Sequence, residues 1–167
     1  MDEVLELITT QYRAREERPR QRSMNQVQTY PFRTCDIPLP QCRTGFVYFL
    51  MSVKNRSYTY IGQTVCIRDR MKAHNSGSGS LSTESIHLRP FALMAYICGF
   101  EGHNKVQREY IERRWKECRD EVIRNGVLDP RQWAKCAQDV LNEIHDQQQD
   151  GFDVSGLHVV YLFRNNE

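Results

Sequence analysis

The sequence lacks a hydrophobic run long enough to cross a membrane. Its longest mostly apolar run, Phe91–Phe100, is far shorter than the ~20 residues that a transmembrane helix needs. The N-terminus, Met-Asp-Glu, also lacks the positive segment and apolar core of a secretory signal. We therefore expect a protein that neither spans a membrane nor is exported, and that works inside the cell, in the cytoplasm or the nucleus.

Closely spaced cysteine pairs are also missing. None of the six cysteines belongs to the C-x-x-C pattern that a zinc ribbon or a redox site needs. We expect free thiols, most of them small residues of the core. Cys35 and Cys42 are seven residues apart in a proline-containing loop, so for this pair a disulfide or half of a metal site stays an alternative.

The chain has no strong excess of charge of either sign. Its net charge of +2 and its pI of 8.2 fall short of the pI above about 9 that marks a strongly basic nucleic-acid-binding domain. Any DNA-binding surface must therefore be a local patch. With 40% hydrophobic and 26% charged residues, the composition excludes collagen, a coiled coil and wholesale disorder. At 167 residues, one domain can build a hydrophobic core without disulfides or a structural metal.

The first part of the chain, residues 1–43, is predicted as a helix followed by a basic, proline-containing arm. Apolar residues recur at helical spacing from Val4 to about Glu17, and arginines then cluster around Pro19. Arg18, Arg20 and Arg22 could bind a phosphate backbone, and a solvated run of charge is the alternative. The compact domain is predicted to begin near Thr44 and to cover residues 44–167.

A β-hairpin is predicted at the start of this domain. The runs Phe46–Met51 and Ser57–Ile61 are rich in strand-forming residues and are separated by turn residues. If the turn centres on Lys54, Tyr48 lies directly opposite Tyr60 on one face, with Cβ atoms about 5 Å apart. Tyr58 is expected on the same face as a packing residue.

Helices and strands alternate along the rest of the chain. A helix is predicted after Thr64 as its N-cap, followed by a flexible, exposed Gly/Ser loop over Ser76–Ser80. The later predicted elements are a strand over Phe91–Cys98, a helix from about Asn104 to Gly126, a helix from Pro130 to about Gln147 and a strand over Leu157–Phe163. This order predicts an α+β fold with a small, mostly antiparallel central sheet flanked by helices.

Several short motifs resemble the GIY-YIG nuclease domain. They are Phe46-Val47-Tyr48, Tyr60-Ile61-Gly62, Arg70, His74, Asn75, Thr83, Arg89-Pro90-Phe91, Gly99-Phe100 and Ile111-Glu112-Arg113-Arg114-Trp115. The resemblance spans residues 45–116 and is similar to the branch that cuts flaps and junctions. Phe46 stands where the family has glycine, with Gly45 one place earlier, and no cysteine- and histidine-rich zinc module follows.

The resemblance implies a DNA endonuclease that depends on Mg²⁺ or Mn²⁺ and cuts one strand per active site. Cutting a duplex then requires two sites, and hence a homodimer, an accessory partner or two successive nicks. A catalytically inactive fold that serves as a nucleic-acid-binding module is the alternative, as is an interaction domain that binds no nucleic acid.

The chemistry of phosphodiester hydrolysis suits these residue types. Arg70 offers a charged fork that matches phosphate oxygens. By the resemblance, Tyr48 or Tyr60 orients or deprotonates the water, with Tyr48 favoured, and a phenol acting as base needs a pKa below its usual value near 10. His74 lies one helical turn beyond Arg70, where it could bind phosphate, act as an alternative base or only pack.

A single carboxylate is predicted to hold the metal ion. Glu112 is favoured over Glu109 because it adjoins the apolar stripe that carries Ile111 and Trp115, and one glutamate suffices for Mg²⁺. Gly62 could let a phosphate backbone come close. The other candidate DNA-binding residues are basic and could form a rim if they share a face: Lys54, Arg56, Arg68, Lys72, Lys105, Arg108 and Arg113.

Overall fold

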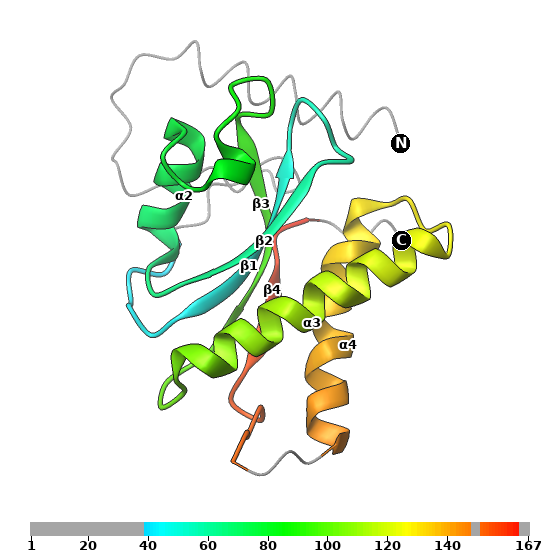
Figure 1. Ribbon diagram of the computed structural model, residues 1–167. Coiled ribbons are helices and arrows are strands. Elements are labelled where there is room, and N and C mark those ends of the chain that lie inside the picture. Colours follow the sequence, from blue (N-terminus) through cyan, green and yellow to red (C-terminus); the bar gives the residue numbers. More distant parts are fainter. Residues whose placement is uncertain (1–38, 148–150, 164–167) are drawn as a thin grey trace.

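The computed structural model describes residues 39–147 and 151–163 (Figure 1). The predicted N-terminal helix, the arginines of the basic arm at 18, 20 and 22, and Cys35 lie outside these ranges. In chain order the elements are β1 (Phe46–Ser52), β2 (Thr59–Thr64), α2 (Ile67–Ser76), the short 3₁₀ helix η1 (Leu81–Thr83), β3 (Phe91–Cys98), α3 (Lys105–Arg124), α4 (Pro130–Gln147) and β4 (His158–Tyr161).

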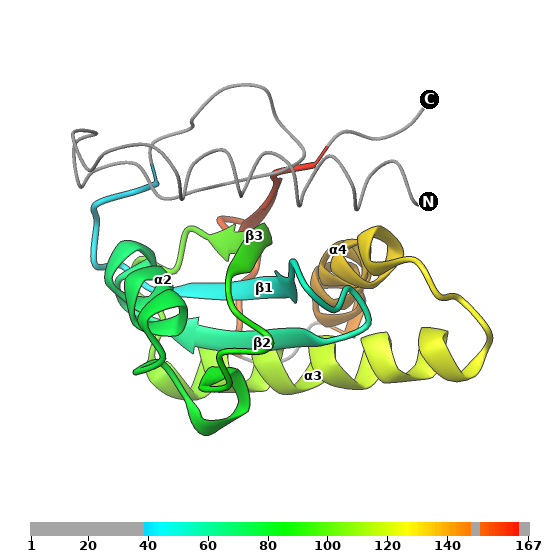
Figure 2. The same ribbon diagram turned by 90° about the horizontal axis from the view of Figure 1, so that it is seen from above.

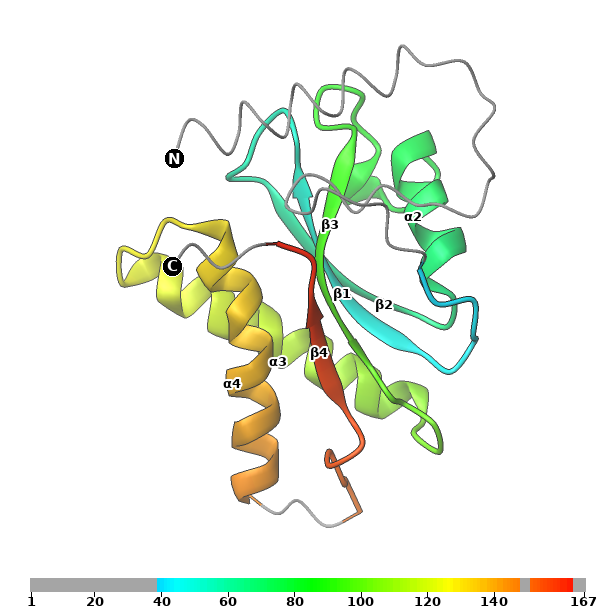
Figure 3. The ribbon, with the colours of Figure 1, turned by 180° about the vertical axis from the view of Figure 1, so that it is seen from behind.

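The four strands form one antiparallel sheet in the order β2-β1-β3-β4. Helix α2 lies against one face, and α3 and α4 cover the other (Figures 1 and 2). Strand β4 lies beside β3 at the outer edge (Figure 3). The α+β fold with a small antiparallel sheet is therefore confirmed.

Both faces of the central strand β1 are buried, which explains its continuous apolar sequence. Val47 and Phe49 point into the larger core, against α3 and α4, where Phe49 stacks on Trp115 with ring centroids 5.7 Å apart. Phe46, Tyr48 and Leu50 alternate onto the α2 face. A polar hydroxyl on Tyr48 is thereby placed inside a buried layer.

The hairpin register differs from the predicted one. Tyr48 pairs with Gly62, so the turn centres on Asn55 and not on Lys54. Backbone hydrogen bonds in the turn account for the shift, because Ser52 N–H donates to the carbonyl of Tyr58 at 2.9 Å and Tyr58 N–H donates to Asn55 at 2.9 Å. The shift is two residues, so Tyr60 still faces the same side as Tyr48.

The helix boundaries follow from their caps. Asn104 and Gln107 form a reciprocal capping box at the start of α3, with both hydrogen bonds at 3.0 Å. The prediction that Thr64 caps α2 is wrong, because Cys66 occupies the N-cap position and the Thr64 hydroxyl accepts from the Cys66 N–H at 3.2 Å. Of the described cysteines, all free thiols, Cys66 and Cys136 are buried.

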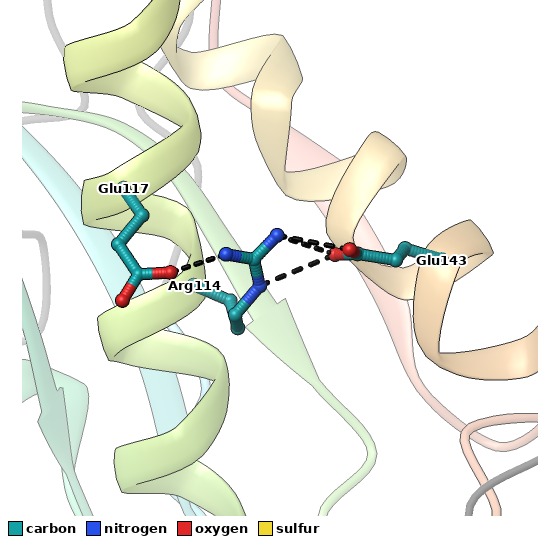
Figure 4. Close-up of polar contacts among 3 residues, drawn as sticks. All are labelled: Arg114, Glu117 and Glu143. Carbon is teal, nitrogen blue, oxygen red and sulfur yellow. Dashed lines mark hydrogen bonds and ion pairs between the residues drawn. The ribbon is translucent and has the colours of Figure 1, made fainter. Parts of the chain in front are cut away.

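Helices α3 and α4 are joined by a branched ion pair (Figure 4). Arg114 donates from Nη2 to both carboxylate oxygens of Glu143, at 2.9 and 2.8 Å, and also contacts Glu117 on its own helix. Such a fork-to-carboxylate contact holds the two helices in one relative position. Among the described residues, no helix is both long enough and apolar enough to span a membrane.

Candidate active site

Tyr48 is the centre of a buried polar cluster on the α2 face of the sheet. Its side chain has no exposed surface. The hydroxyl oxygen lies 2.7 Å from Nε2 of His74 and accepts a hydrogen bond from Nε of Arg70 at 3.2 Å. Arg70 and His74 are four residues apart on α2, so the helix presents both to the same phenol.

Tyr60 comes from the neighbouring strand β2 and is partly exposed. Its ring centroid lies 6.2 Å from that of Tyr48 and 4.9 Å from that of His74. Arg70 also interacts electrostatically with Tyr60, so its guanidinium acts on both phenols. The two tyrosines, the arginine and the histidine predicted from the motifs thus meet in one place.

Gly62 lies between the two phenols. A Cβ atom at this position would be 2.6 Å from the Tyr48 hydroxyl and 2.7 Å from Cε1 of Tyr60. The space beside Gly62 is therefore filled by tyrosine rings, and the expectation that it leaves room for a phosphate backbone is corrected. A side chain is missing here because the phenols pack against the strand.

Burial dominates the protonation of the cluster. It raises the pKa of Tyr48 well above the ordinary value, and the hydrogen bond and charge of Arg70 lower it by less. Tyr48 therefore lacks the lowered pKa that a phenol acting as base needs. Burial, helped by the charge of Arg70, lowers the pKa of His74 to about 4. At neutral pH the phenol of Tyr48 is protonated and the imidazole of His74 is uncharged.

Of the two candidate carboxylates on α3, Glu112 is the more enclosed. Its side chain is 19% exposed and pairs with Lys116 at 2.9 Å, whereas the side chain of Glu109 is 50% exposed and pairs with Lys105 at 3.5 Å. The negative charge of Glu112 is among the causes that raise the pKa of Tyr48. Glu112 therefore lies close enough to the tyrosine cluster to act on it electrostatically.

A divalent ion fits this donor set. Mg²⁺ binds through one or two carboxylates and completes its octahedron with water and substrate phosphate, so the single carboxylate of Glu112 is enough to hold it. A second group, Cys118, Cys136 and Asp139, brings potential ligand atoms within 4.8 Å of one another. Its thiolates favour softer metals such as Zn²⁺, so this group does not correspond to the predicted Mg²⁺ site.

The predicted basic rim is not one patch. Lys54 and Arg56 lie in the β1–β2 turn, at the opposite end of the hairpin from Arg68 at the start of α2 (Figure 1). Lys72 is exposed on α2. Arg108 is only 8% exposed, and its Nε donates to Oε1 of Gln63 at 3.1 Å, so it belongs to the interior and not to a rim.

Sequence reasoning assigned no role to the loop between α2 and η1, which it expected to be flexible and exposed. Gly79 in this loop packs against His74, and Thr83 at its end has no exposed surface. Oγ1 of Thr83 lies 2.6 Å from Nδ1 of His74. A threonine nine residues after the histidine, behind a Gly/Ser loop, is the signal that could have identified this contact.

Paired tyrosines on adjacent antiparallel strands, with arginine and histidine on the next helix, define a nuclease-type core. A sequence model of the GIY-YIG catalytic domain matches residues 44–121, which include the whole cluster. A "UPF0213 protein in ldhD 5'region" from Pediococcus acidilactici is 30% identical over 88 residues, covering 50% of this chain and 87% of that protein. The chain belongs to the GIY-YIG family, a nuclease superfamily.

Proposed function

We propose that this protein is a divalent-metal-dependent DNA endonuclease that hydrolyses phosphodiester bonds and cuts one strand per active site. The observation that carries this proposal is the position of Arg70. Its guanidinium hydrogen-bonds to Tyr48 and interacts electrostatically with Tyr60, it is only partly buried, and it comes from the helix that also carries His74. A fixed cation beside hydroxyl groups suits the charge that develops on a phosphate under attack.

Glu112 would hold the Mg²⁺ or Mn²⁺ ion, exchanging its contact with Lys116. When bound, the ion supplies charge neutralisation at the phosphate and acidifies a coordinated water. Arg70 binds the non-bridging phosphate oxygens through its remaining N–H groups. Arg70 comes from α2 and Glu112 from α3, so the two residues belong to different elements and their effects are separable by mutation.

The two tyrosines take different parts. Tyr60 is partly exposed and can contact the attacking water, whereas Tyr48 has no exposed surface and a raised pKa. Both properties of Tyr48 oppose a role as base, so we assign it the orienting role and assign contact with the water to Tyr60. This reverses the preference drawn from the sequence, where burial was not visible.

DNA is the proposed partner. Lys54, Arg56, Arg68 and Lys72 remain candidates for phosphate contacts, and so do Arg18, Arg20 and Arg22 of the arm. Because each site cuts one strand, duplex cleavage requires a second copy, an accessory protein or two successive nicks. An intracellular location is part of this proposal.

Nicking of a supercoiled plasmid tests the proposal directly. With Mg²⁺ or Mn²⁺ we expect nicked circles before linear DNA, and no product in EDTA. Arg70→Lys keeps the charge and loses the fork, so it should lower the rate by at least about 100-fold. Arg124→Lys, at the far end of α3, is the matched control and should nick normally.

A protein that binds DNA but nicks it with neither metal would contradict the enzyme and support an inactive binding module. Nicking that persists in EDTA would contradict the dependence on a divalent metal. Linear product formed without a nicked intermediate would contradict cutting of one strand per site.

A further inference from the structure

We propose that Thr83 is a positioning residue, which holds His74 in the tautomer protonated at Nδ1 and thereby aims Arg70 through Tyr48. The catalytic half of this inference rests on the proposed function. The tautomer half does not, because it follows from the hydrogen bonds and from the uncharged state of the buried His74.

The three residues that connect Thr83 to the active-site phenol are all buried. Thr83, His74 and Tyr48 each have no exposed surface. Oγ1 of Thr83 lies 2.6 Å from Nδ1 of His74, and the other ring nitrogen, Nε2, lies 2.7 Å from the Tyr48 hydroxyl. The imidazole is therefore held from both sides. Buried polar atoms in native proteins almost always have partners. Each N–H or O–H in this row of hydrogen bonds, from Thr83 through His74 to Tyr48, must therefore have an acceptor.

Counting donors fixes the direction of the row. Arg70 can only donate, so its Nε–H donates to the oxygen of Tyr48. The protonated phenol then needs an acceptor for its own O–H, and Nε2 of His74 supplies one. Since His74 is uncharged, its one ring proton must sit on Nδ1, from where it donates to Thr83.

The row of hydrogen bonds ends at a backbone carbonyl group. The Thr83 hydroxyl donates to the carbonyl of Ser80 at 3.3 Å, which leaves its oxygen free to accept from His74. The opposite tautomer would place a proton on Nε2 and leave the buried Tyr48 hydroxyl without this acceptor. One arrangement satisfies each donor, and it requires a hydroxyl at position 83.

The loop that contains Gly79 packs against the His74 side of this row of hydrogen bonds. A Cβ atom on Gly79 would lie 2.6 Å from Nδ1 of His74 and 2.8 Å from its Cα. The loop backbone thus packs directly on the imidazole. Thr83, at the end of the same loop, is the partner that the structure gives Nδ1.

The consequence reaches Arg70 through two hydrogen bonds. His74 orients the Tyr48 O–H, and this turns a lone pair of the phenol oxygen toward Nε of Arg70. With Nε so fixed, the guanidinium is held in one orientation, and its terminal nitrogens are the groups that the proposed function uses to bind phosphate. Thr83 itself does not contact the substrate. Loss of its hydroxyl should nevertheless leave the Arg70 side chain less firmly oriented.

Thr83→Val and Thr83→Ser test both halves. Long-range ¹H–¹⁵N spectra of the full chain read the His74 tautomer without any activity. We expect the Nδ1–H form in the wild type and in Thr83→Ser, and loss of its predominance in Thr83→Val. Plasmid nicking should fall on the order of 10- to 100-fold in Thr83→Val, at similar DNA affinity, and recover in Thr83→Ser. Thr59→Val, in β2, is the matched control.

A wild-type His74 protonated on Nε2 would overturn the inference, and that measurement requires no variant to fold. An unchanged tautomer in Thr83→Val would also overturn it. If the tautomer changes and nicking does not, Thr83 does not position Arg70. If the wild type never nicks DNA, the proposed function fails, while the spectra still decide the tautomer.

Discussion

Tyr48 and Gly62 face each other as partners in the β1–β2 ladder, and the phenol hydroxyl lies only 2.6 Å from the position that a Cβ of residue 62 would take. This pairing explains why the motif Phe46-Val47-Tyr48 occurs together with the motif Tyr60-Ile61-Gly62. The tyrosine of the first strand needs the glycine of the second, because its ring crosses the partner strand to reach α2. Tyr60, two residues earlier on β2, then packs beside it.

Gly62→Ala should destabilise the protein and abolish nicking together. The added methyl would press on both phenols, and overpacking of this kind typically lowers the free energy of unfolding by about 1–3 kcal/mol. Urea denaturation and plasmid nicking measure the two effects. Gly156→Ala is the matched control, because its Cβ would meet nothing closer than the Gly99 carbonyl at 4.0 Å. A fully active Gly62→Ala protein would contradict the packing argument.

Removing one hydroxyl from each tyrosine should separate their roles. Tyr48→Phe leaves Nε2 of His74 and Nε of Arg70 without their shared partner, so we expect the free energy of unfolding to fall by about 1–3 kcal/mol. Tyr60→Phe, at a partly exposed position, should change stability little. Both should nick slowly. If both variants nick at the wild-type rate, the two tyrosines serve only in packing.

The strands and their faces could be predicted from alternation, whereas the meeting of Tyr48, Tyr60, Arg70 and His74 was predicted from the resemblance of their motifs to the GIY-YIG domain. The register could not, since Ser52 and Asn55 close the turn through contacts that no pattern encodes. The protonation state of Tyr48 could not be predicted from the sequence either. It depends on how deeply the folded protein buries the phenol, and burial raises the pKa of Tyr48 more than the charge of Arg70 lowers it.

Stability should fall in mild acid because of His74. Its pKa is about 4 in the folded protein and about 6.5 when unfolded, so protons bind preferentially to the unfolded chain between these values. The contribution is complete above pH 6.5 and is lost as the pH falls toward 4. At pH 5 we expect a loss of about 2 kcal/mol relative to pH 7. Urea denaturation at both values measures it, and His87→Gln, at an exposed position, should leave the loss intact.

Deleting residues 1–22 should weaken DNA binding and flatten its dependence on salt, with catalysis retained. An arginine arm binds by releasing counterions from phosphates, and each contact contributes a slope of about 0.9 in log affinity against log salt. Fluorescence anisotropy over a salt series measures this slope. A variant with Arg18, Arg20 and Arg22 changed to lysine keeps the charge and should keep the slope. An unchanged slope after deletion would show that the arm does not touch DNA.

Glu112→Gln should nearly abolish cleavage while fold and DNA affinity persist. The substitution keeps the shape and removes the one carboxylate placed to hold the metal, so nicking should fall by at least about 100-fold. Its ion pair with Lys116 is of the i,i+4 helical kind, worth only about 0.3–0.5 kcal/mol, so the melting temperature should hardly move. Glu109→Gln removes an equivalent pair with Lys105 one turn earlier and should nick normally.

Mn²⁺ binding, read from the relaxation of water protons in the presence of DNA, separates loss of the ion from loss of a later step. We expect Glu112→Gln to bind Mn²⁺ more weakly, and Glu109→Gln to bind it as the wild type does. If the two variants exchange behaviour, the carboxylate is Glu109, and the enclosure of Glu112 beside Ile111 and Trp115 serves only the packing of α3. If both variants cleave normally, no glutamate of this helix holds the metal, and hydrolysis rests on Arg70 and the tyrosines.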